Sequence, residues 1–220
     1  MSAAVVITIR VMARWEPNAR GRLEQAAMDL YAERGFDQTT VAEIAARAGL
    51  TERTFFRHYA DKREVLFGGS EALSERLVAS VAGAPDSATP LDATAAALEE
   101  AGALIQAARG RDFARARHSI IAANAELQER ELIKLASWGN TLAEALRARG
   151  VNQRAATLAA EAGIAVFHVA FDRWVGDDED GDLPTLIRES FGELKALTAK
   201  RRKPATASDE TPSRSSGIAS

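Results

Sequence analysis

Apolar residues recur at helical spacing along most of this chain, with clear start and stop signals between the segments. The first regular stripe predicts a helix that begins near Asn18, which can cap it, and runs to Arg34, just before Gly35. The stripe consists of Leu23, Ala26, Ala27, Leu30 and Tyr31, which repeat at i, i+3, i+4, i+7 and i+8.

Two shorter helices follow, joined by a tight turn. Thr40 and Glu43 form a capping-box sequence, and Gly49 ends the first helix because glycine readily adopts the left-handed conformation. Thr51 is a suitable N-cap for the second helix, which should run to about Tyr59. The pair predicts a helix-turn-helix, whose second helix can lie in the DNA major groove. The alternative is a small helical hairpin without a ligand.

The remaining chain is rich in alanine and keeps the helical period. Asp61 and Glu64 repeat the capping-box pattern, and later breaks fall at Pro85, Pro90 and several glycines. We therefore expect an all-α fold, with further helices at about residues 61–82, 90–108, 112–123, 125–149, 152–175 and 184–201.

The exposed face of the second short helix carries side chains that can read DNA. Phe55 and Tyr59 lie four residues apart and should both point into the core. Arginine can contact guanine, threonine a base or a thymine methyl, and glutamate cytosine. The outward residues are Thr51, Glu52, Arg53, Thr54, Arg57 and His58. Arg57, His58 and the nearby Lys62 are better suited to contact phosphate than bases. Arg20 and Arg22 are either phosphate contacts or a solvated first turn.

These motifs resemble the N-terminal domain of TetR-type (tetracycline-repressor family) transcriptional regulators over about residues 20 to 66, without a gap. The matching residues are Ala26-Ala27, Leu30-Tyr31, Gly35-Phe36, Thr39-Thr40, Ile44-Ala45, Ala48-Gly49, Thr54-Phe55-Phe56 and Asp61-Lys62. The resemblance implies a homodimer with a DNA-binding domain and a C-terminal domain for a small effector. It also implies that Thr40, Glu52, Arg53, Thr54, Phe56, His58 and Lys62 face DNA. Phe56 stands where many relatives have a tyrosine that bonds a phosphate, so that bond is lost or replaced by packing.

Four regions follow from the pattern and the resemblance. We expect a disordered extension at 1–16 (with Met12 as an alternative start), a helix-turn-helix domain at 17–63, a helical effector-binding and dimerisation domain at 64–201, and a disordered tail at 202–220. The apolar run Ala3–Ile9 is too short to span a bilayer and has no positive region before it, so we expect a cytoplasmic protein with no membrane partner. Arg10 and Arg14 either enter a minor groove or belong to a floppy tail.

Composition narrows the classes of function. The 220 residues contain no cysteine, which excludes disulfides and cysteine-ligated zinc. The net charge of −3 argues against nonspecific coating of nucleic acid, and residues 10–63 carry ten Lys+Arg against eight Asp+Glu, so the remainder is acidic. No phosphate loop, nucleophile elbow or zinc-protease motif is present, so we expect no catalytic residues, no cofactor, no metal and no enzyme activity. The acidic run 177–182 lacks two calcium-loop ligands and is interpreted as a solvated loop.

Large apolar residues on separate helices predict either an ordinary core or an effector cavity between them. The candidate lining is Phe113, His118, Ile121, Trp138, Phe167, His168 and Phe171. Further apolar candidates are Ile120 and Trp174, and further polar candidates are Asn124 and Asn140. The basic segment Arg109, Arg111, Arg115 and Arg117 either attracts an anionic effector or forms a solvated face.

The last two helices should form the dimer interface that the resemblance implies. The expected contacts are Leu158, Ala159, Ala162, Gly163, Val166, Leu186 and Phe191, in which small residues let two helices approach closely. We therefore interpret the chain as a dimeric repressor that a small molecule releases from a palindromic double-stranded DNA operator. The alternatives are a helical enzyme with an incidental helix-turn-helix, and an architectural DNA binder whose C-terminal domain is packed solid.

Overall fold

The computed structural model describes residues 18–176 and 181–199, and every regular element in these ranges is helical. The all-α prediction is therefore confirmed. The expectations for residues 1–16, for positions 177–180 of the acidic run and for the tail at 202–220 lie outside the described residues.

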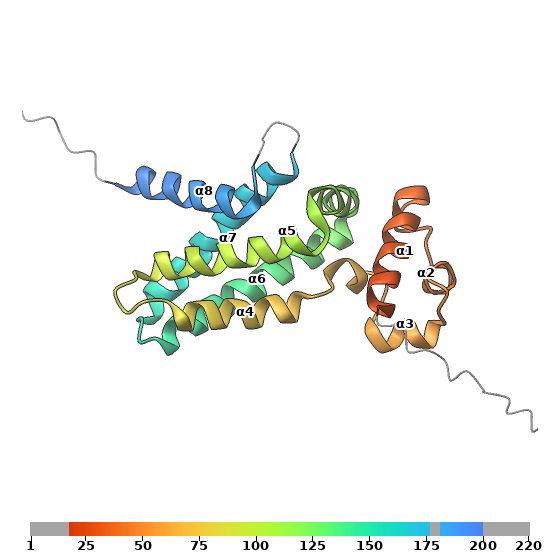
Figure 1. Ribbon diagram of the computed structural model, residues 1–220, viewed down its shortest axis with the longest axis horizontal. Coiled ribbons are helices and arrows are strands. Elements are labelled where there is room, and N and C mark those ends of the chain that lie inside the picture. The colour runs from red at the N-terminus through yellow and green to blue at the C-terminus, as the bar shows by residue number, and fades with distance from the viewer. Residues whose placement is uncertain (1–17, 177–180, 200–220) are drawn as a thin grey trace, which may run out of the picture.

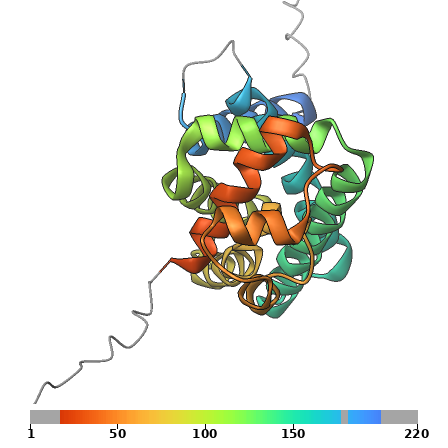
Figure 2. The same cartoon turned by 90° about the vertical axis from the view of Figure 1, so that its right-hand side faces the viewer.

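Three helices form a head at one end of the elongated molecule (Figure 1). They are α1 (Ala19–Arg34), α2 (Val41–Arg47) and α3 (Glu52–His58). Asn18 caps α1 as predicted, because its Oδ1 accepts a hydrogen bond of 3.1 Å from the backbone N–H of Gly21. Figure 2 views the molecule from the head end, with the body helices behind it.

The body is a helical bundle, and a linker (residues 60–69) connects it to the head. Its helices are α4 (Ser70–Gly83), α5 (Pro90–Ala122), α6 (Ala125–Ala148), α7 (Gln153–Val175) and α8 (Leu183–Thr198). α5 and α7 are the central pair, since each packs against α6 and α8 as well as against the other. The predicted break in α5 falls at Gly110, where φ is 77°.

The expected continuous helix at 61–82 is wrong. Asp61 does cap, since its Oδ1 accepts from the backbone N–H groups of Arg63 (2.8 Å) and Glu64 (3.2 Å). Only the short 3₁₀ helix η1 (Glu64–Phe67) follows, and the chain turns at Gly68 and Gly69 before α4 begins. A Cβ at Gly68 would lie 2.6 Å from Glu24 Oε1, so the linker passes close to α1 there, and Gly69 has a φ of 88°, which favours glycine.

Two apolar cores hold the molecule together, and the second one joins head to body. The body core is built around Leu98, Leu142 and Trp174. The head core surrounds Leu23 and Phe55 and continues beyond the head. Its members from the linker, α5 and α6 are Val65, Leu66, Phe67, Ile120, Ile121 and Leu127.

Ion pairs reinforce this junction around the linker. Arg63 contacts Glu126 of α6 at 2.6 Å, and Glu64 pairs with Arg130 and, at 3.3 Å, with Lys134. Burial alone raises the pKa of Glu64, but the hydrogen bonds from Arg130 and Lys134 outweigh it and hold the pKa below its ordinary value. Glu64 is therefore ionised throughout the neutral range and fixes the linker to α6.

The basic segment of α5 is not the solvated face that was one of its two interpretations. Arg111 donates to the carbonyl of Gly176 at 2.7 Å, and Arg115 donates to Val175 (2.8 Å) and Gly176 (3.0 Å). These arginines therefore satisfy carbonyls at the C-terminal end of α7, where intrahelical partners run out. They tie the half of α5 that follows the kink at Gly110 to the central helix of the body.

α7 packs tightly against α5 at Gly163. A Cβ there would meet Thr94 Cγ2 at 2.4 Å and Leu98 Cδ1 at 3.0 Å, both on α5. Gly163→Ala should therefore lower the free energy of unfolding by about 1–3 kcal/mol, because the branched Thr94 side chain cannot move aside easily. Urea denaturation measures the change.

Gly192 of α8 provides the matched control, because a Cβ at that position would meet nothing within 4 Å. Gly192→Ala should leave stability unchanged or raise it by up to about 1 kcal/mol, as alanine favours a helix. Equal stability of the Gly163→Ala variant and the wild type would contradict the close packing of α7 on α5.

Glu64→Gln should lower stability by about 1 kcal/mol at neutral pH, because it removes a carboxylate that two cations contact. A lowered pKa stabilises the folded state above the ordinary pKa of 4.5 and loses that effect as pH falls through the folded-state value. The difference between variant and wild type should thus shrink in acid. The control is Glu126→Gln, whose side chain is 55% exposed and whose loss should cost less. A pH-independent difference would argue against this role of Glu64.

Candidate functional site

The turn between α2 and α3 has the geometry that its sequence predicts. The backbone N–H of Thr40 donates to Glu43 Oε2 at 2.9 Å, and that of Glu43 donates to Thr40 Oγ1 at 3.3 Å, which completes the capping box. Gly49 has a φ of 66°, and Thr51 Oγ1 accepts from the N–H of Thr54 at 3.2 Å. The helix-turn-helix is therefore fixed by its own local hydrogen bonds.

α3 buries one face and exposes the other. Phe55 and Tyr59 are buried in the head core, as predicted, whereas Phe56 has 55% of its surface exposed. The predicted DNA contacts Thr40, Thr51, Glu52, Arg53 and Arg57 are exposed, and Thr54, His58 and Lys62 are half-buried. The face of α3 thus offers Glu52, Arg53, Phe56 and Arg57 to a partner outside the molecule.

Lys62 has a role inside the head that the sequence interpretation did not include. Its ammonium donates to the carbonyls of Phe36 (2.8 Å), Thr39 (3.0 Å) and Asp37 (3.4 Å) and lies 4.2 Å from the centroid of the Phe36 ring. These bonds hold the linker against the loop between α1 and α2. A phosphate at Lys62 would compete with them.

Arg22 is also used within the head, where its guanidinium donates to the carbonyl of Ala48 at the end of α2. A Cβ on Gly49 would lie 2.7 Å from the same guanidinium, so the glycine both turns the chain and leaves room for Arg22. Arg20 stacks over the Tyr59 ring at 5.5 Å. Neither arginine is the loosely solvated first turn that was one alternative.

A hydrogen-bonded chain connects the end of α3 to the body. The Tyr59 hydroxyl donates to Glu24 Oε1 of α1 at 2.7 Å, and Arg109 of α5 contacts Glu24 Oε2 at 2.6 Å. Burial raises the pKa of the Tyr59 hydroxyl, and the Glu24 carboxylate raises it further, so the phenol stays a hydrogen-bond donor. Displacement of Arg109 would therefore be felt at the C-terminal end of α3.

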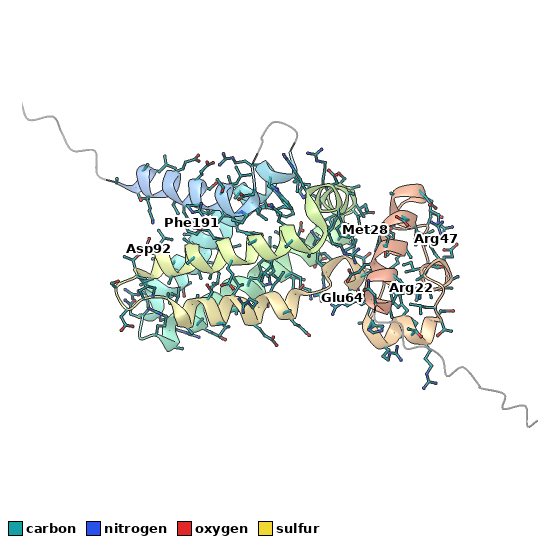
Figure 3. All side chains as sticks on the ribbon, in the orientation of Figure 1. Arg22, Met28, Arg47, Glu64, Asp92 and Phe191 are labelled. Carbon is teal, nitrogen blue, oxygen red and sulfur yellow. The ribbon has the colours of Figure 1, made fainter. Side chains whose placement is uncertain are left out.

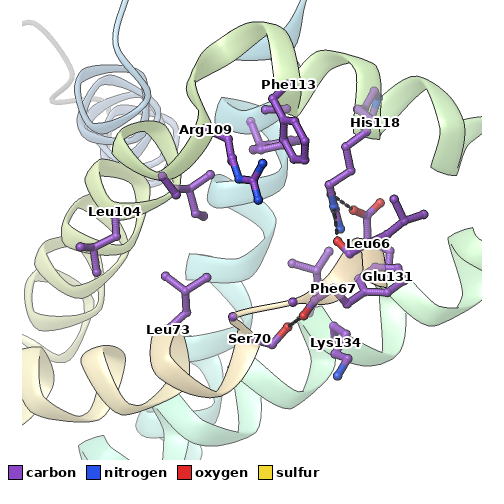
Figure 4. A pocket seen from close by; sticks show the side chains of 18 of the residues that line it. Leu66, Phe67, Ser70, Leu73, Leu104, Arg109, Phe113, His118, Glu131 and Lys134 are labelled. Carbon is purple, nitrogen blue, oxygen red and sulfur yellow. Dashed lines mark hydrogen bonds and ion pairs between the residues drawn. The ribbon is translucent and has the colours of Figure 1, made fainter. Parts of the chain in front are cut away.

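The body contains a cavity of about 500 Å³ that reaches the linker and the head (Figure 4). α1 contributes Glu24 and Met28, and the remaining lining comes from η1 and α4 to α7. Six of the seven residues predicted for an effector site line it, namely Phe113, His118, Trp138, Phe167, His168 and Phe171. The presence of this cavity argues against the architectural DNA binder, for which a solid body was expected.

Ile121 was predicted for the cavity, and this prediction is wrong. Its side chain is buried in the head core instead, because α5 turns away from the cavity at its C-terminal end. Asn124 and Asn140, considered as polar lining groups, do not reach the cavity either. Asn124 donates to the carbonyl of Ile120 at 2.7 Å, and Asn140 is exposed.

Sequence reasoning missed the part of the cavity that the linker and α4 form. Leu66, Phe67, Gly68, Gly69, Ser70 and Leu73 all line it. The adjacent glycines Gly68 and Gly69 were the available signal, since two glycines inside a helical pattern indicate a break. Without that break, the expected helix at 61–82 would have carried these residues past the cavity.

Arg117 lies at the boundary between cavity and linker. Its guanidinium donates to the carbonyl of Leu66 at 2.7 Å and to Glu131 of α6 at 3.1 Å, and it lies 5.1 Å from the centroid of the Phe67 ring (Figure 4). Burial lowers the pKa of Arg117 and Glu131 acts against that shift, but a guanidinium stays charged in proteins. Arg117 therefore holds η1 against α5 and α6 through a permanent charge.

The predicted dimer contacts are mostly used inside the protomer. Ala159, Gly163, Val166, Leu186 and Phe191 are buried, and Ala162 is half-buried. The five buried residues pack between α7 and its neighbours α5 and α8, so they are not free for a second copy. Leu158 is the member of the set that faces outward, with 71% of its surface exposed.

Another apolar set occupies the outer sides of α7 and α8. Val169 is 53% exposed and Leu197 is 84% exposed, and Ala165 is also exposed. Leu158, Ala162, Ala165 and Val169 follow one another at i, i+4, i+7 and i+11, which places them on one face of α7. Figure 3 shows side chains along these outer helices, opposite the end that carries Arg22 and Arg47.

The part of the chain that the structure describes gives little support to a metal site or a membrane-spanning helix. Within residues 18–176 and 181–199, no group of three or more His, Asp or Glu side chains could hold a metal ion. One helix, α7, is long and apolar enough to cross a membrane by length and composition alone. Core helices pass the same test, and α7 lies at the centre of the bundle.

Comparison with known sequences identifies both parts of the chain. Residues 24–68 match the family model described as bacterial regulatory proteins, tetR family, and residues 88–199, just over half of the chain, match the one described as MftR C-terminal domain. The HTH-type transcriptional regulator TcmR of Streptomyces glaucescens is 36% identical over 78 residues. That alignment covers 36% of this chain and 34% of TcmR, so it spans about a third of the relative's length.

Solved structures have a similar fold. The complex of SmeT with triclosan has a TM-score of 0.57 at 20% identity and covers 89% of this chain and 99% of that chain. SmeT is the repressor of the Stenotrophomonas maltophilia multidrug efflux pump SmeDEF. FadR of Bacillus subtilis with stearoyl-CoA has a TM-score of 0.52 at 21% identity, covering 79% and 96% of the two chains. With the family models, the helix-turn-helix and the cavity in agreement, the chain belongs to the tetR family of bacterial regulatory proteins.

Proposed function

We propose that this chain is a cytoplasmic, dimeric transcriptional repressor that binds a palindromic DNA operator and leaves it when a small molecule enters the body cavity. We further propose that it has no catalytic activity of its own. The observation that carries this proposal is the position of the cavity, which is lined by residues of the head, the linker and the body together. A ligand in the cavity would therefore contact the junction between the DNA-binding head and the ligand-binding body.

The head supports the DNA-binding part of the proposal. Its α3 presents Glu52, Arg53, Phe56 and Arg57 outward. Thr51 caps this helix, and Thr40 caps α2, which precedes it. Arginine and glutamate can read base edges, while Phe56 offers an apolar surface to a sugar or a thymine methyl. Arg53 lies in the first turn of α3, from which recognition helices contact bases.

Two routes couple the cavity to α3. The first runs from Arg109, which lines the cavity, through Glu24 to the hydroxyl of Tyr59 at the end of α3. The second runs from Arg117 to the Leu66 carbonyl in the linker. A ligand that shifts either arginine favours a different head position, and its differential affinity for the two positions sets how far the equilibrium moves.

Solved structures with a similar fold suggest what the effector is only by analogy. The solved complexes of SmeT and FadR carry triclosan and stearoyl-CoA, respectively. These two ligands differ in size and charge, so they do not indicate the chemistry of the effector. That chemistry has to be inferred from the residues of this chain. The decisive experiment is selection of bound DNA from random sequence, followed by a screen for compounds that release it.

The dimer should form through the outward apolar set of α7 and α8, which consists of Leu158, Ala162, Ala165, Val169 and Leu197. These residues leave apolar surface exposed beside the fully packed inner face of the same helices. Pairing two copies of one surface gives a two-fold axis, which relates the two α3 helices and matches a palindromic operator.

Arg53→Ala should weaken operator binding by about 1–3 kcal/mol and relax the preference at one base pair in each half-site. The physical reason is loss of a side chain that can bond a base edge at two points. Titration of the selected operator and of a scrambled duplex measures both effects. Arg154→Ala, on an exposed position of α7, is the control and should change neither. Equal weakening on both duplexes would remove Arg53 from base reading.

Leu158→Glu combined with Val169→Glu should convert the dimer to a monomer, because four carboxylates would face one another across the two-fold axis. Sedimentation velocity measures the mass, and operator titration should show nonspecific affinity only. Leu132→Glu on α6 is the matched control, since Leu132 is 62% exposed and lies outside the proposed interface. A dimer that survives the double substitution would place the interface elsewhere.

A further inference from the structure

The charged side chains that line the cavity are already paired within the protein. Arg109 contacts Glu24 at 2.6 Å, and Arg117 contacts Glu131 at 3.1 Å. Lys134 contacts Glu64 at 3.3 Å, and Arg76 pairs with Glu100. An anionic ligand at Arg109 or Arg117 would have to break the pair with Glu24 or Glu131, and either carboxylate would lose that partner in a largely apolar cavity. Such a carboxylate is costly, so the lining disfavours anions.

Two polar atoms of the lining are buried without a partner among the described residues. They are Trp138 Nε1 and His118 Nδ1. An indole N–H can only donate, so Trp138 requires a hydrogen-bond acceptor. A neutral imidazole nitrogen can donate or accept, so His118 suits a hydroxyl or a carbonyl. Buried polar groups normally have partners, so these two atoms are hydrogen-bonding groups that a ligand in the cavity could satisfy.

The same two residues end a row of rings along one wall. The Trp138 ring meets Phe167 edge-on at 5.6 Å, Phe167 stacks with Phe171 at 5.9 Å, and His118 lies 6.1 Å from Phe171. Phe67 and Phe113 add further aromatic surface. Ring faces and edges interact favourably with other rings, and a rigid ligand loses less conformational entropy than a flexible chain.

We propose that the effector is an uncharged, ring-containing compound whose oxygen acceptor receives a hydrogen bond from Trp138 Nε1. This inference rests on the proposed function, because it names the ligand class of the same cavity. The proposed ligand class distinguishes this chain from a regulator that binds anionic ligands such as acyl-CoA. The apolar lining holds the rings, and Trp138 and His118 fix their orientation.

Three matched compounds test the charge and the acceptor separately. Flavone is neutral and carries a ring carbonyl, flavan lacks that carbonyl, and flavone-6-carboxylate adds a negative charge. Isothermal titration with the full-length dimer should rank flavone first. Flavan should bind about tenfold more weakly, which corresponds to one hydrogen bond, and the carboxylate and stearoyl-CoA should bind more weakly still.

Trp138→Phe should weaken flavone about tenfold and leave flavan unchanged, because flavan has no carbonyl to accept from the indole. Trp174→Phe is the matched control. Trp174 is equally buried in the body core but does not line the cavity, so this variant should bind both compounds as the wild type does. Thermal melting of both variants checks that each is folded.

Glu131→Gln provides a gain of function that does not depend on the tryptophan. The substitution removes the carboxylate that pairs with Arg117 and so leaves a cation available in the lining. The affinity for flavone-6-carboxylate should rise about tenfold or more relative to the affinity for flavone. Arg117 keeps its bond to the Leu66 carbonyl, which supports the fold.

The inference is overturned if the carboxylate or stearoyl-CoA binds the wild type at least as tightly as flavone, if Trp138→Phe leaves flavone affinity unchanged, or if no flavone compound binds up to its solubility limit. The operator assay separates this failure from that of the proposed function. Release of operator DNA by stearoyl-CoA would keep the repressor proposal and reject the neutral ligand. Tight flavone binding without any change in operator affinity would keep the ligand class and reject the coupling.

Discussion

The largely buried guanidinium of Arg117 joins three parts of the molecule, namely α5, the linker and α6. It extends from α5, donates to the Leu66 carbonyl of the linker and to Glu131 of α6, and lies over the Phe67 ring. Because it cannot lose its charge, it stabilises the fold only while these partners stay in place. The linker therefore has one well-defined position beside the cavity, and any second position of the head requires a new set of partners for Arg117.

The linker separates two different environments. One is the apolar cavity, and the other is a polar groove lined by Arg63, Glu64, Glu126 and Arg130 on the far side of the same residues. Phe67, Gly68, Gly69 and Ser70 line both. The ion pairs in the groove are mostly part-exposed and individually weak, so they bias the position of the linker without fixing it permanently. A ligand in the cavity thus competes with ion pairs whose interaction energies are similar to those of the contacts that the ligand itself forms.

Sequence alone predicted the local structure of the head well. The caps at Asn18, Thr40 and Thr51 and the turn at Gly49 need only near neighbours, and each was found as expected. The division of α5 at Gly110 was predicted for the same reason. Most cavity residues were also predicted, because large aromatic side chains at helical spacing must pack against one another somewhere in the body.

What sequence could not supply was set by contacts between distant segments. The expected helix breaks at Gly68 and Gly69, where Glu24 of α1 lies against the linker, and Lys62 bonds carbonyls more than twenty residues away in the chain. Gly163 looked suitable for a helix of a second copy, yet the partner that approaches it is α5 of the same chain. Periodicity shows that a face is apolar or small, but it does not show which neighbour covers that face.

The same ambiguity applies to α7, which carries apolar residues on its outer as well as its inner face. Its inner face packs into the body core through residues such as Ala160 and Phe167, while Leu158 and Val169 remain outside. A helix buried on one side within a single chain does not need the outer apolar residues for its own stability. Their presence on the central helix, which also lines the cavity through Phe167 and Phe171, places the proposed dimer axis next to the ligand. A shift of α7 caused by a ligand would therefore change the spacing of two heads at once, which is the quantity that a palindromic operator reads.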